Sequence, residues 1–272
     1  MSYADVDGLS LYYEEHGSGE PLVLLHGGIG ASEMFAAILD ELAEARRVIA
    51  VDLPGHGHTP DVDRPLRAEL LADDVAALIE HLGLEQTDAM GYSLGGLTAL
   101  RTAIQHPDRV RRLVLVSIPF RRDGSYPEVV AAMDAMGPDL AELIKQAPVY
   151  EHYARVAPRP EDWTSHIVKT AEFVKIDFDW SAEVAALAVR TMLVYADADS
   201  VRPDHIVEFY GLLGGGRRDA GVDGSGRPPA RLAVLPGTTH YDIVASPLLP
   251  AVVGPFLDAP EPAAGAGTVS AP

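Results

Sequence analysis

The fold is decided by the stretch TDAMGYSLGGLTAL at residues 87–100, in which an apolar segment runs into a serine flanked by glycines. The spacing Gly91-x-Ser93-x-Gly95 is informative when a strand enters it and a helix leaves it. A strand that turns sharply into a helix crowds the residue at the apex, so glycines two positions either side let the backbones pass. The crowding pushes Ser93 toward a strained conformation worth roughly 1–3 kcal/mol. We therefore expect the Ser93 hydroxyl to be raised above the sheet, where a ligand can meet it.

The length of 272 residues fits one large α/β domain, or a domain with a smaller subdomain, and leaves ample chain to bury a core. No apolar run approaches the roughly 18 residues that a membrane span needs. The first residues, MSYAD, are not a basic region followed by an apolar stretch, so no secretory signal is visible and we expect a cytoplasmic protein. Cysteine is absent, which excludes disulfides, thiolate catalysis and cysteine-ligated metals.

The formal net charge of -19 argues against nucleic acids and anionic membranes as partners. The same charge is also what a highly soluble protein carries, and we favour that interpretation. A small molecule is the expected partner, and the sequence does not indicate an oligomeric state.

Short apolar runs alternate with longer amphipathic ones along the chain. Four of these runs are continuous rather than alternating, at residues 22–25, 48–51, 113–116 and 192–195. Continuous runs of this length predict strands buried on both faces, as in a parallel sheet covered by helices. Between them, one face of a helix is indicated by Leu71, Val75, Leu78 and Leu82, with Gly83 as a C-cap. The fold class is therefore α/β, with a doubly wound and mostly parallel sheet. Residues 9–15 alternate more and predict an antiparallel edge strand.

The alternation stops after Ser117 and resumes at Thr191. The residues between them read as helices separated by proline and glycine, which predicts a helical cap inserted between two core strands. The last residues are rich in alanine, glycine and proline, as in a flexible tail. The predicted organisation is a core at 1–117 and 191–258, a cap at 118–190, and a tail at 259–272.

A serine hydroxyl is a poor nucleophile unless a base lies within hydrogen-bond reach and a carboxylate orients that base. In this architecture the partners follow in the order serine, acid, histidine. Asp197 and Asp199 follow one strand-like run, and His240 follows the next run, at residues 231–235. The carboxyl ends of parallel strands meet at one edge of the sheet. The sequence therefore predicts a catalytic triad of Ser93, His240 and one of the two aspartates.

Several further segments make the chain resemble the α/β-hydrolase superfamily from about Tyr12 to Leu257. They are Leu25-His26-Gly27-Gly28, Asp52-Leu53-Pro54-Gly55-His56-Gly57, the turn at Ser93, His106-Pro107-Asp108-Arg109-Val110, the Asp199 loop and Pro236-Gly237-Thr238-Thr239-His240. The resemblance implies a serine nucleophile at Ser93, a base at His240 and an acid in the loop of Asp197 and Asp199. In the family this acid commonly lies four residues before a proline, and Pro203 fits Asp199. Asp197 is the alternative acid, or a residue that hydrogen-bonds the loop.

Acyl transfer also needs hydrogen-bond donors for the oxyanion, each worth about 3–4 kcal/mol. The backbone N–H of Leu94, at the start of the helix, is one candidate. The other comes from Gly28 or Ile29, and the resemblance favours Gly28, which follows His-Gly.

The resemblance also assigns structural roles to several polar residues. His26 is expected beneath the loop of Gly28 rather than as a second base. Asp52, His56 and His58 look like metal ligands when taken alone, but the matching family segment is a structural loop. We therefore expect no metal and no cofactor.

The resulting prediction is a carboxylic-ester hydrolase for small or medium, mainly apolar substrates. Candidate substrate-binding residues are Ile29, Tyr92, Phe120, Met133, Met136, Tyr150, Tyr153, Trp163 and Tyr241. A lactonase or a carbon–carbon bond hydrolase with the same triad is the first alternative, and a non-catalytic ligand-binding module is the second. Dehalogenase and epoxide-hydrolase chemistry are disfavoured, because those relatives use aspartate where Ser93 stands. Activity should fall at low pH, where His240 takes up a proton.

Overall fold

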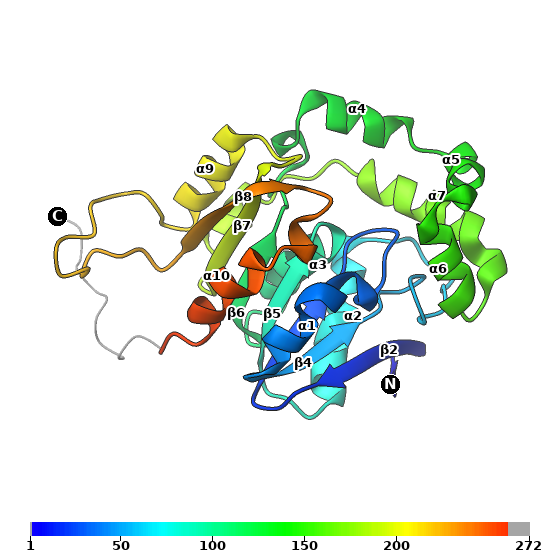
Figure 1. Cartoon of the computed structure of the whole chain (residues 1–272), viewed down its shortest axis with the longest axis horizontal. Helices are drawn as coiled ribbons and strands as arrows, with labels where there is room; N and C mark the ends of the chain where they lie inside the picture. Colours follow the sequence, from blue (N-terminus) through cyan, green and yellow to red (C-terminus); the bar gives the residue numbers. More distant parts are fainter. Residues whose placement is uncertain (1, 261–272) are drawn as a thin grey trace.

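Eight strands form one sheet in the order β1-β2-β4-β3-β5-β6-β7-β8 in the computed structural model, which describes residues 2–260 (Figure 1). The strands are β1 (Ser2–Val6), β2 (Leu9–His16), β3 (Glu20–Leu25), β4 (Arg46–Val51), β5 (Thr87–Tyr92), β6 (Val110–Val116), β7 (Arg190–Ala198) and β8 (Arg231–Thr239). Strand β2 runs antiparallel to β1 and β4, and all the other neighbours are parallel. The predicted doubly wound, mostly parallel sheet is confirmed.

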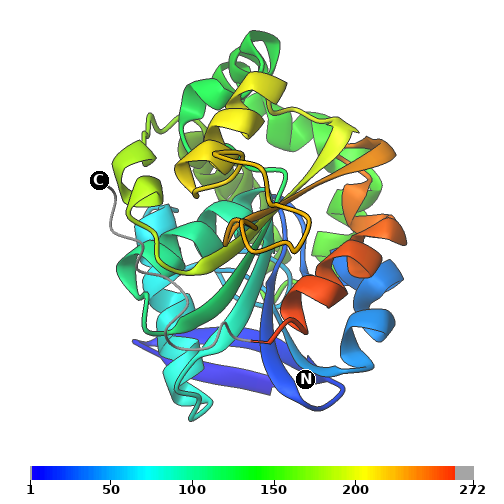
Figure 2. The ribbon, with the colours of Figure 1, turned by 90° about the vertical axis from the view of Figure 1, so that its left-hand side faces the viewer.

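Helices cover both faces of this sheet, which is why its central strands are continuously apolar. The core helices are α1 (Ala36–Ala43), α2 (Ala68–His81), α3 (Leu94–Gln105), α9 (Pro203–Leu212) and α10 (Leu248–Leu257). Figure 2 shows α1 and α10 on one side of the sheet and α2 and α3 on the other. Each side has its own apolar core, with Leu71 and Val75 of α2 in one and Ile38 and Leu249 in the other.

The first strands differ from the prediction in one respect. Residues 9–15 are antiparallel as expected, but β2 is not at the edge, because β1 pairs along its outer side. The two strands are joined by Asp7 and Gly8, which have φ values of 50° and 79°. An Asp-Gly pair with positive φ at both positions is the usual two-residue hairpin turn.

A second group of helices lies between β6 and β7. They are α4 (Pro127–Ala135), α5 (Pro138–Leu143), α6 (Pro148–Val156), α7 (Trp163–Val174) and α8 (Ser181–Ala185). Short 3-10 helices lie in the same region at Arg122–Gly124, Ile144–Gln146 and Pro160–Asp162, and in the core at Ser32–Phe35 and Ile243–Ala245. Helices α4 to α7, which we call the cap, lie beyond the carboxyl ends of the strands (Figure 1). Helix α8 differs, since Val184 packs into the core of the sheet. Helix α4 contains no buried residue.

The C-terminal end of the described chain lies against the core. The carbonyl of Ala259 accepts a hydrogen bond from Arg112 at 2.6 Å, and that of Pro260 accepts one from Arg190 at 3.0 Å. The remainder of the predicted tail, residues 261–272, lies outside the described residues. Among residues 2–260, no helix combines the length and the apolarity needed to cross a bilayer.

Candidate active site

Ser93 stands at the sharp turn between β5 and α3. Its φ of 52° and ψ of -119° lie outside the regions that residues with a side chain normally occupy. A Cβ on Gly91 would come within 2.1 Å of the Gly95 carbonyl oxygen, and a Cβ on Gly95 within 2.3 Å of the Leu25 carbonyl oxygen. Both positions therefore require glycine, and the close passage of β5, α3 and β3 holds Ser93 in its strained conformation.

Ser93 lines a cavity of about 600 Å³ between the carboxyl ends of the strands and the cap. His240, Gly28 and Leu94 line the same cavity. Most of the remaining wall is apolar: Leu97, Ile118, Pro119, Val129, Ala132, Met133, Met136, Phe173, Val174 and Phe178. The cavity falls in the size range of small-molecule sites and combines an apolar wall with a few polar groups.

His240 directly follows β8, and Asp199 directly follows β7. Nδ1 of His240 lies 3.4 Å from Oδ1 of Asp199, whose side chain is only 1% exposed. The phenol of Tyr92 donates a hydrogen bond of 2.6 Å to the carbonyl oxygen of His240, which ties the histidine loop to the end of β5. Burial raises the pKa of Tyr92, so the phenol stays neutral and remains a donor.

The carboxylate of Asp199 is well supplied with donors. Oδ2 accepts hydrogen bonds from Oγ of Ser117 at 2.6 Å and from the N–H of Ala196 at 2.9 Å, and Oδ1 accepts the N–H of Ser200 at 2.7 Å. Burial by itself would raise the pKa of Asp199, but the hydrogen bonds from His240, Ser117 and Ala196 outweigh it and lower that pKa. Asp199 is therefore an anion beside the His240 ring.

The alternative acid, Asp197, lies in a different environment. It is exposed, and its oxygens accept the N–H groups of Gly237 at 2.9 Å and Thr238 at 3.1 Å. These bonds join the ends of β7 and β8. Asp197 thus hydrogen-bonds the loop that leads to His240, whereas Asp199 faces the imidazole.

Ser93 and His240 line the same cavity, but no hydrogen bond joins their side chains within the described part of the chain. Hydrogen bonds between catalytic groups are often long in free enzymes and tighten when substrate binds.

Two backbone N–H groups can serve a negative charge near Ser93. Leu94 begins α3, where free N–H groups and the helix dipole favour an anion. Gly28 lies in the loop after β3, close to Leu94, since a Cβ placed there would meet the Leu94 side chain at 3.6 Å. Ile29 also lines the cavity and has a φ of 59°.

The structure divides the remaining predicted binding residues into two groups. Ile29, Tyr92, Met133, Met136 and Tyr241 line the cavity. Phe120, Tyr150, Tyr153 and Trp163 do not, so their predicted role in binding is corrected to packing.

The packing of these four residues has a plain physical cause. Phe120 is fully buried and stacks on His205, with 4.0 Å between ring centroids. Tyr150 and Tyr153 pack on Trp163 at about 5 Å, inside the cap's own apolar cluster. Apolar spacing along a helix identifies a buried face, but not whether that face meets a cavity or another helix.

The polar residues that resemble metal ligands in the sequence, together with His26, have hydrogen-bond partners within the protein. His26 is fully buried; its Nε2 accepts the N–H of Leu53 at 3.0 Å, and its Nδ1 contacts the Gly27 carbonyl at 2.7 Å. Asp52 accepts the N–H groups of Ser32 at 2.8 Å and His58 at 2.9 Å. Within residues 2–260, no group of three or more histidine, aspartate or glutamate side chains is arranged to hold a metal ion.

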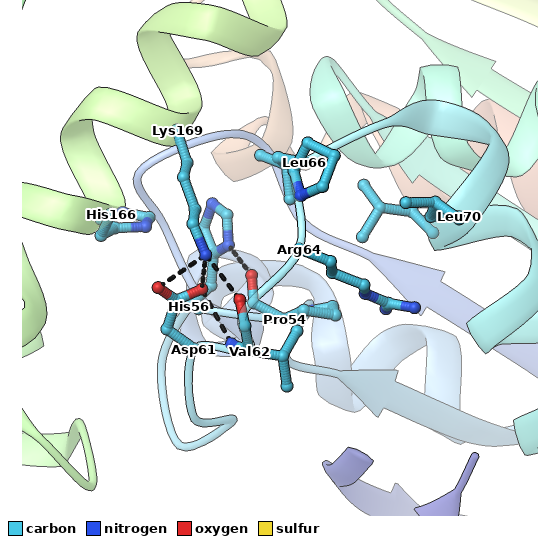
Figure 3. A pocket seen from close by; sticks show the side chains of 12 residues that line it. Pro54, His56, Asp61, Val62, Arg64, Leu66, Leu70, His166 and Lys169 are labelled. Atoms are coloured by element: carbon cyan, nitrogen blue, oxygen red, sulfur yellow. Dashed lines mark hydrogen bonds and ion pairs between the residues drawn. The ribbon is translucent and has the colours of Figure 1, made fainter. Parts of the chain in front are cut away.

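A second, much smaller cavity of about 10 Å³ lies where α7 meets the loop after β4 (Figure 3). Nζ of Lys169 points toward Asp61 there, 2.7 and 2.9 Å from its two oxygens. The ring of His166, also on α7, packs edge-on against His56 at 4.3 Å. This cavity holds about one water molecule, so we interpret the cluster as the anchor of the cap on the core.

Sequence reasoning missed six polar residues that line the large cavity: Ser117, Arg122, Ser125, Glu128, Thr170 and Ser200. Ser117, which has a φ of 55°, and Ser200 both contact the acid–histidine pair, and Arg122 lines the wall beneath α4. Ser117 directly follows β6, so the rule that located Asp199 and His240 at strand ends also applies to it. Ser200 and Arg122 had no comparable signal.

Comparison with known proteins places these features in a family context. Residues 20–153 match the family model described as "alpha/beta hydrolase fold". The chain is 30% identical over 224 residues to a 2-hydroxymuconate semialdehyde hydrolase of Pseudomonas sp. (strain CF600), a match that covers 72% of this chain and 76% of the relative. It is 42% identical over 132 residues to a pimeloyl-[acyl-carrier protein] methyl ester esterase of Neisseria meningitidis, covering 45% of this chain and 49% of that protein.

A similar fold occurs in the solved structure of a thermophilic esterase from Thermogutta terrifontis. The TM-score is 0.67 and the sequence identity 23%, over 94% of this chain and 96% of that one.

Proposed function

Because the chain belongs to the alpha/beta hydrolase fold family, we propose that it is a serine hydrolase that cleaves carboxylic esters of small or medium, mainly apolar substrates. One observation carries the proposal. The strained Ser93 shares a cavity of about 600 Å³ with His240, whose Nδ1 lies 3.4 Å from the buried Asp199.

In the proposed mechanism, Oγ of Ser93 attacks the ester carbonyl carbon while Nε2 of His240 takes its proton. The N–H groups of Gly28 and Leu94 hold the tetrahedral oxyanion. The leaving alcohol departs with the proton from His240, which leaves an acyl group on Ser93. Water then attacks the acyl-enzyme, gives its proton to His240, and the acid is released as the proton returns to Ser93. Asp199 stabilises the imidazolium in both steps.

The cavity wall supports mainly apolar substrates. Phe173, Met133 and Val129 offer no hydrogen bonds, so affinity would come from apolar area removed from water, at about 25 cal/mol per Å². Arg122 and Glu128 are the lysine-, arginine-, aspartate- or glutamate-type charged side chains among those that line the cavity. Nη2 of Arg122 already lies 2.6 Å from Asp134, which lowers its pull on a substrate anion.

A second candidate function keeps the triad and changes the bond that breaks. It is hydrolysis of a carbon–carbon bond, or of a lactone. The Pseudomonas relative favours the carbon–carbon bond, because the substrate in its name, a hydroxymuconate semialdehyde, has no ester or lactone bond. The distinction depends on how the substrate sits over Ser93, which the residues named above do not determine.

A panel of p-nitrophenyl esters of increasing chain length, lactones and vinylogous diketones would separate these functions. We expect the short and medium esters to be turned over fastest and Ser93→Ala to abolish turnover. Faster hydrolysis of the diketones would replace the ester proposal with the second candidate. A fluorophosphonate probe should label the native protein and not Ser93→Ala, and a native protein that remains unlabelled would indicate a non-catalytic binding module.

A further inference from the structure

We propose that Ser200 is a positioning residue that holds the His240 imidazole for its role as a base, jointly with Asp199. The inference rests on the proposed function and deepens it. Ser200 follows the acid directly in the chain, and its hydroxyl, rather than the carboxylate, is the closest hydrogen-bonding partner of the ring.

The distances place the hydroxyl next to both the ring and the carboxylate, and nearer to the ring. Oγ of Ser200 lies 2.9 Å from Nδ1 of His240, whereas Oδ1 of Asp199 lies 3.4 Å from the same nitrogen. Oγ of Ser200 is also 3.4 Å from Oδ1 of Asp199. A separation of 2.9 Å is an ordinary hydrogen bond, and 3.4 Å is beyond the usual range. The ring is therefore oriented mainly by Ser200 and electrostatically by Asp199.

The charge of Asp199 decides which way the hydrogen bond runs. An anion on this side of the ring favours a proton on Nδ1, so the ring N–H donates to Ser200 and the hydroxyl hydrogen is directed to Asp199. Nε2 then keeps its lone pair, as a base needs. The groups that contact the ring from the neighbouring elements are Asp199 after β7, Tyr92 at the end of β5 and Tyr241 after β8. Two further carboxylates accept backbone N–H groups of the segment that leads to His240: Asp242 that of Thr239, and Asp197 in β7 that of Gly237.

Ser200 is itself held by the segment that leads into the cap. Its carbonyl oxygen accepts the N–H of Tyr126 at 3.1 Å, and the N–H of Arg202 donates to the Gly124 carbonyl at 2.9 Å. Ser125 and Val201 form an antiparallel bridge between these bonds. Tyr126 is the N-cap residue of α4, the helix that lies over the cavity. The position of the ring is thus linked through Ser200 to the start of the cap.

The first test measures kcat, KM and the pH dependence of kcat/KM for Ser200→Ala and Ser200→Thr with a p-nitrophenyl ester. Alanine keeps both backbone hydrogen bonds of residue 200 and removes only the hydroxyl. We expect kcat to fall about tenfold at unchanged KM, the effect of one lost hydrogen bond to a group that becomes charged. The acid limb of the kcat/KM profile should move to lower pH, because the lost hydrogen bond to the Ser200 hydroxyl stabilises the charged imidazolium more than the neutral ring. Threonine should restore both.

A second pair of variants perturbs Ser200 without changing it. Tyr126 has a φ of -62°, which proline adopts, so Tyr126→Pro removes the N–H that Ser200 accepts while keeping the local backbone. Tyr126→Ala keeps the N–H and is the matched control. We expect the proline variant to reproduce the lower kcat and the shifted acid limb, and the alanine variant to resemble the wild type.

Three results would overturn the inference: an unchanged kcat and acid limb in Ser200→Ala, a loss that threonine does not rescue, or an acid limb that moves to higher pH with kcat preserved. The last would mean that the ring moves directly onto Asp199. The failure of the proposed function looks different, since Ser93→Ala would then remain active. An inactive Ser93→Ala together with a fully active Ser200→Ala would reject only the role of Ser200.

Discussion

Replacing Lys169 by methionine should weaken the attachment of the cap to the core. Nζ of Lys169 lies 2.7 and 2.9 Å from the two oxygens of Asp61 and 2.6 Å from the Val62 carbonyl (Figure 3). The Lys169 side chain is 22% exposed and that of Asp61 is 13% exposed. The pair therefore lies between exposed ion pairs, worth about 0–1 kcal/mol, and buried ones, which cost about 3–5 kcal/mol when one partner is removed.

We expect Lys169→Met to lower the free energy of unfolding by about 2 kcal/mol, which corresponds to a fall in Tm of roughly 4–8 °C for a chain of this size. Urea denaturation and calorimetry would measure both quantities. Asp61→Asn completes a double-mutant cycle. Because the two side chains share their hydrogen bonds, the double variant should be more stable than the sum of the single losses by about 1 kcal/mol.

Lys175→Met is the matched control, since Lys175 is also on the cap and donates to the carbonyl of Met136, but at an exposed site. It should change the free energy of unfolding by no more than about 0.5 kcal/mol. A Lys169→Met protein as stable as this control, or strict additivity in the cycle with Asp61→Asn, would refute the reasoning.

Three further outcomes are expected. Ser93→Gly should stabilise the protein by about 1 kcal/mol, because glycine relieves the positive φ of 52°, while Ser93→Ala should not; thermal unfolding of both would show it. Asp199→Asn should lower kcat by about 10³-fold and Asp197→Asn by less than about twofold, since only Asp199 faces the ring. Steady-state kinetics of the two variants would measure this, and a larger loss in Asp197→Asn than in Asp199→Asn would contradict it. Burial lowers the pKa of His166 to about 4, below that of a histidine in the unfolded chain, so the unfolded state binds the proton first as the pH falls. The folded state should therefore lose about 3 kcal/mol of stability between pH 6.5 and pH 4. Urea midpoints measured over that range should fall in the wild type and change less in His166→Phe.

The parts of the fold that could be predicted from the sequence depend on short-range patterns. Gly91 and Gly95 are needed by a turn whose geometry is set within a few residues, and the continuous run at 192–195 needs only helices on both faces to be a buried strand. The first hairpin was missed although Asp7-Gly8 is a strong turn signal, because β1 is short and mostly exposed.

The positions of Ser93, Asp199 and His240 could be predicted because each directly follows a strand, and the topology of the sheet brings those strand ends to one edge; their catalytic roles stay a prediction. The site was not predictable where a side chain's role depends on how helices pack. Trp163 was expected at the cavity, but its indole N–H donates to the Ala141 carbonyl at 2.8 Å inside the cap. The contact of Ser200 with the ring depends on the bend of one loop, and serine is too common for its identity to indicate that bend.

The lack of buried residues in α4 has a consequence for how such a protein can change. Val129, Ala132 and Met133 face the cavity from this helix, yet none of them belongs to a core cluster. Substitutions there alter the ceiling of the cavity while leaving the folding free energy nearly untouched. New substrate preferences can therefore be explored along this one helix, by natural drift or by directed evolution, before any stabilising mutation is required elsewhere.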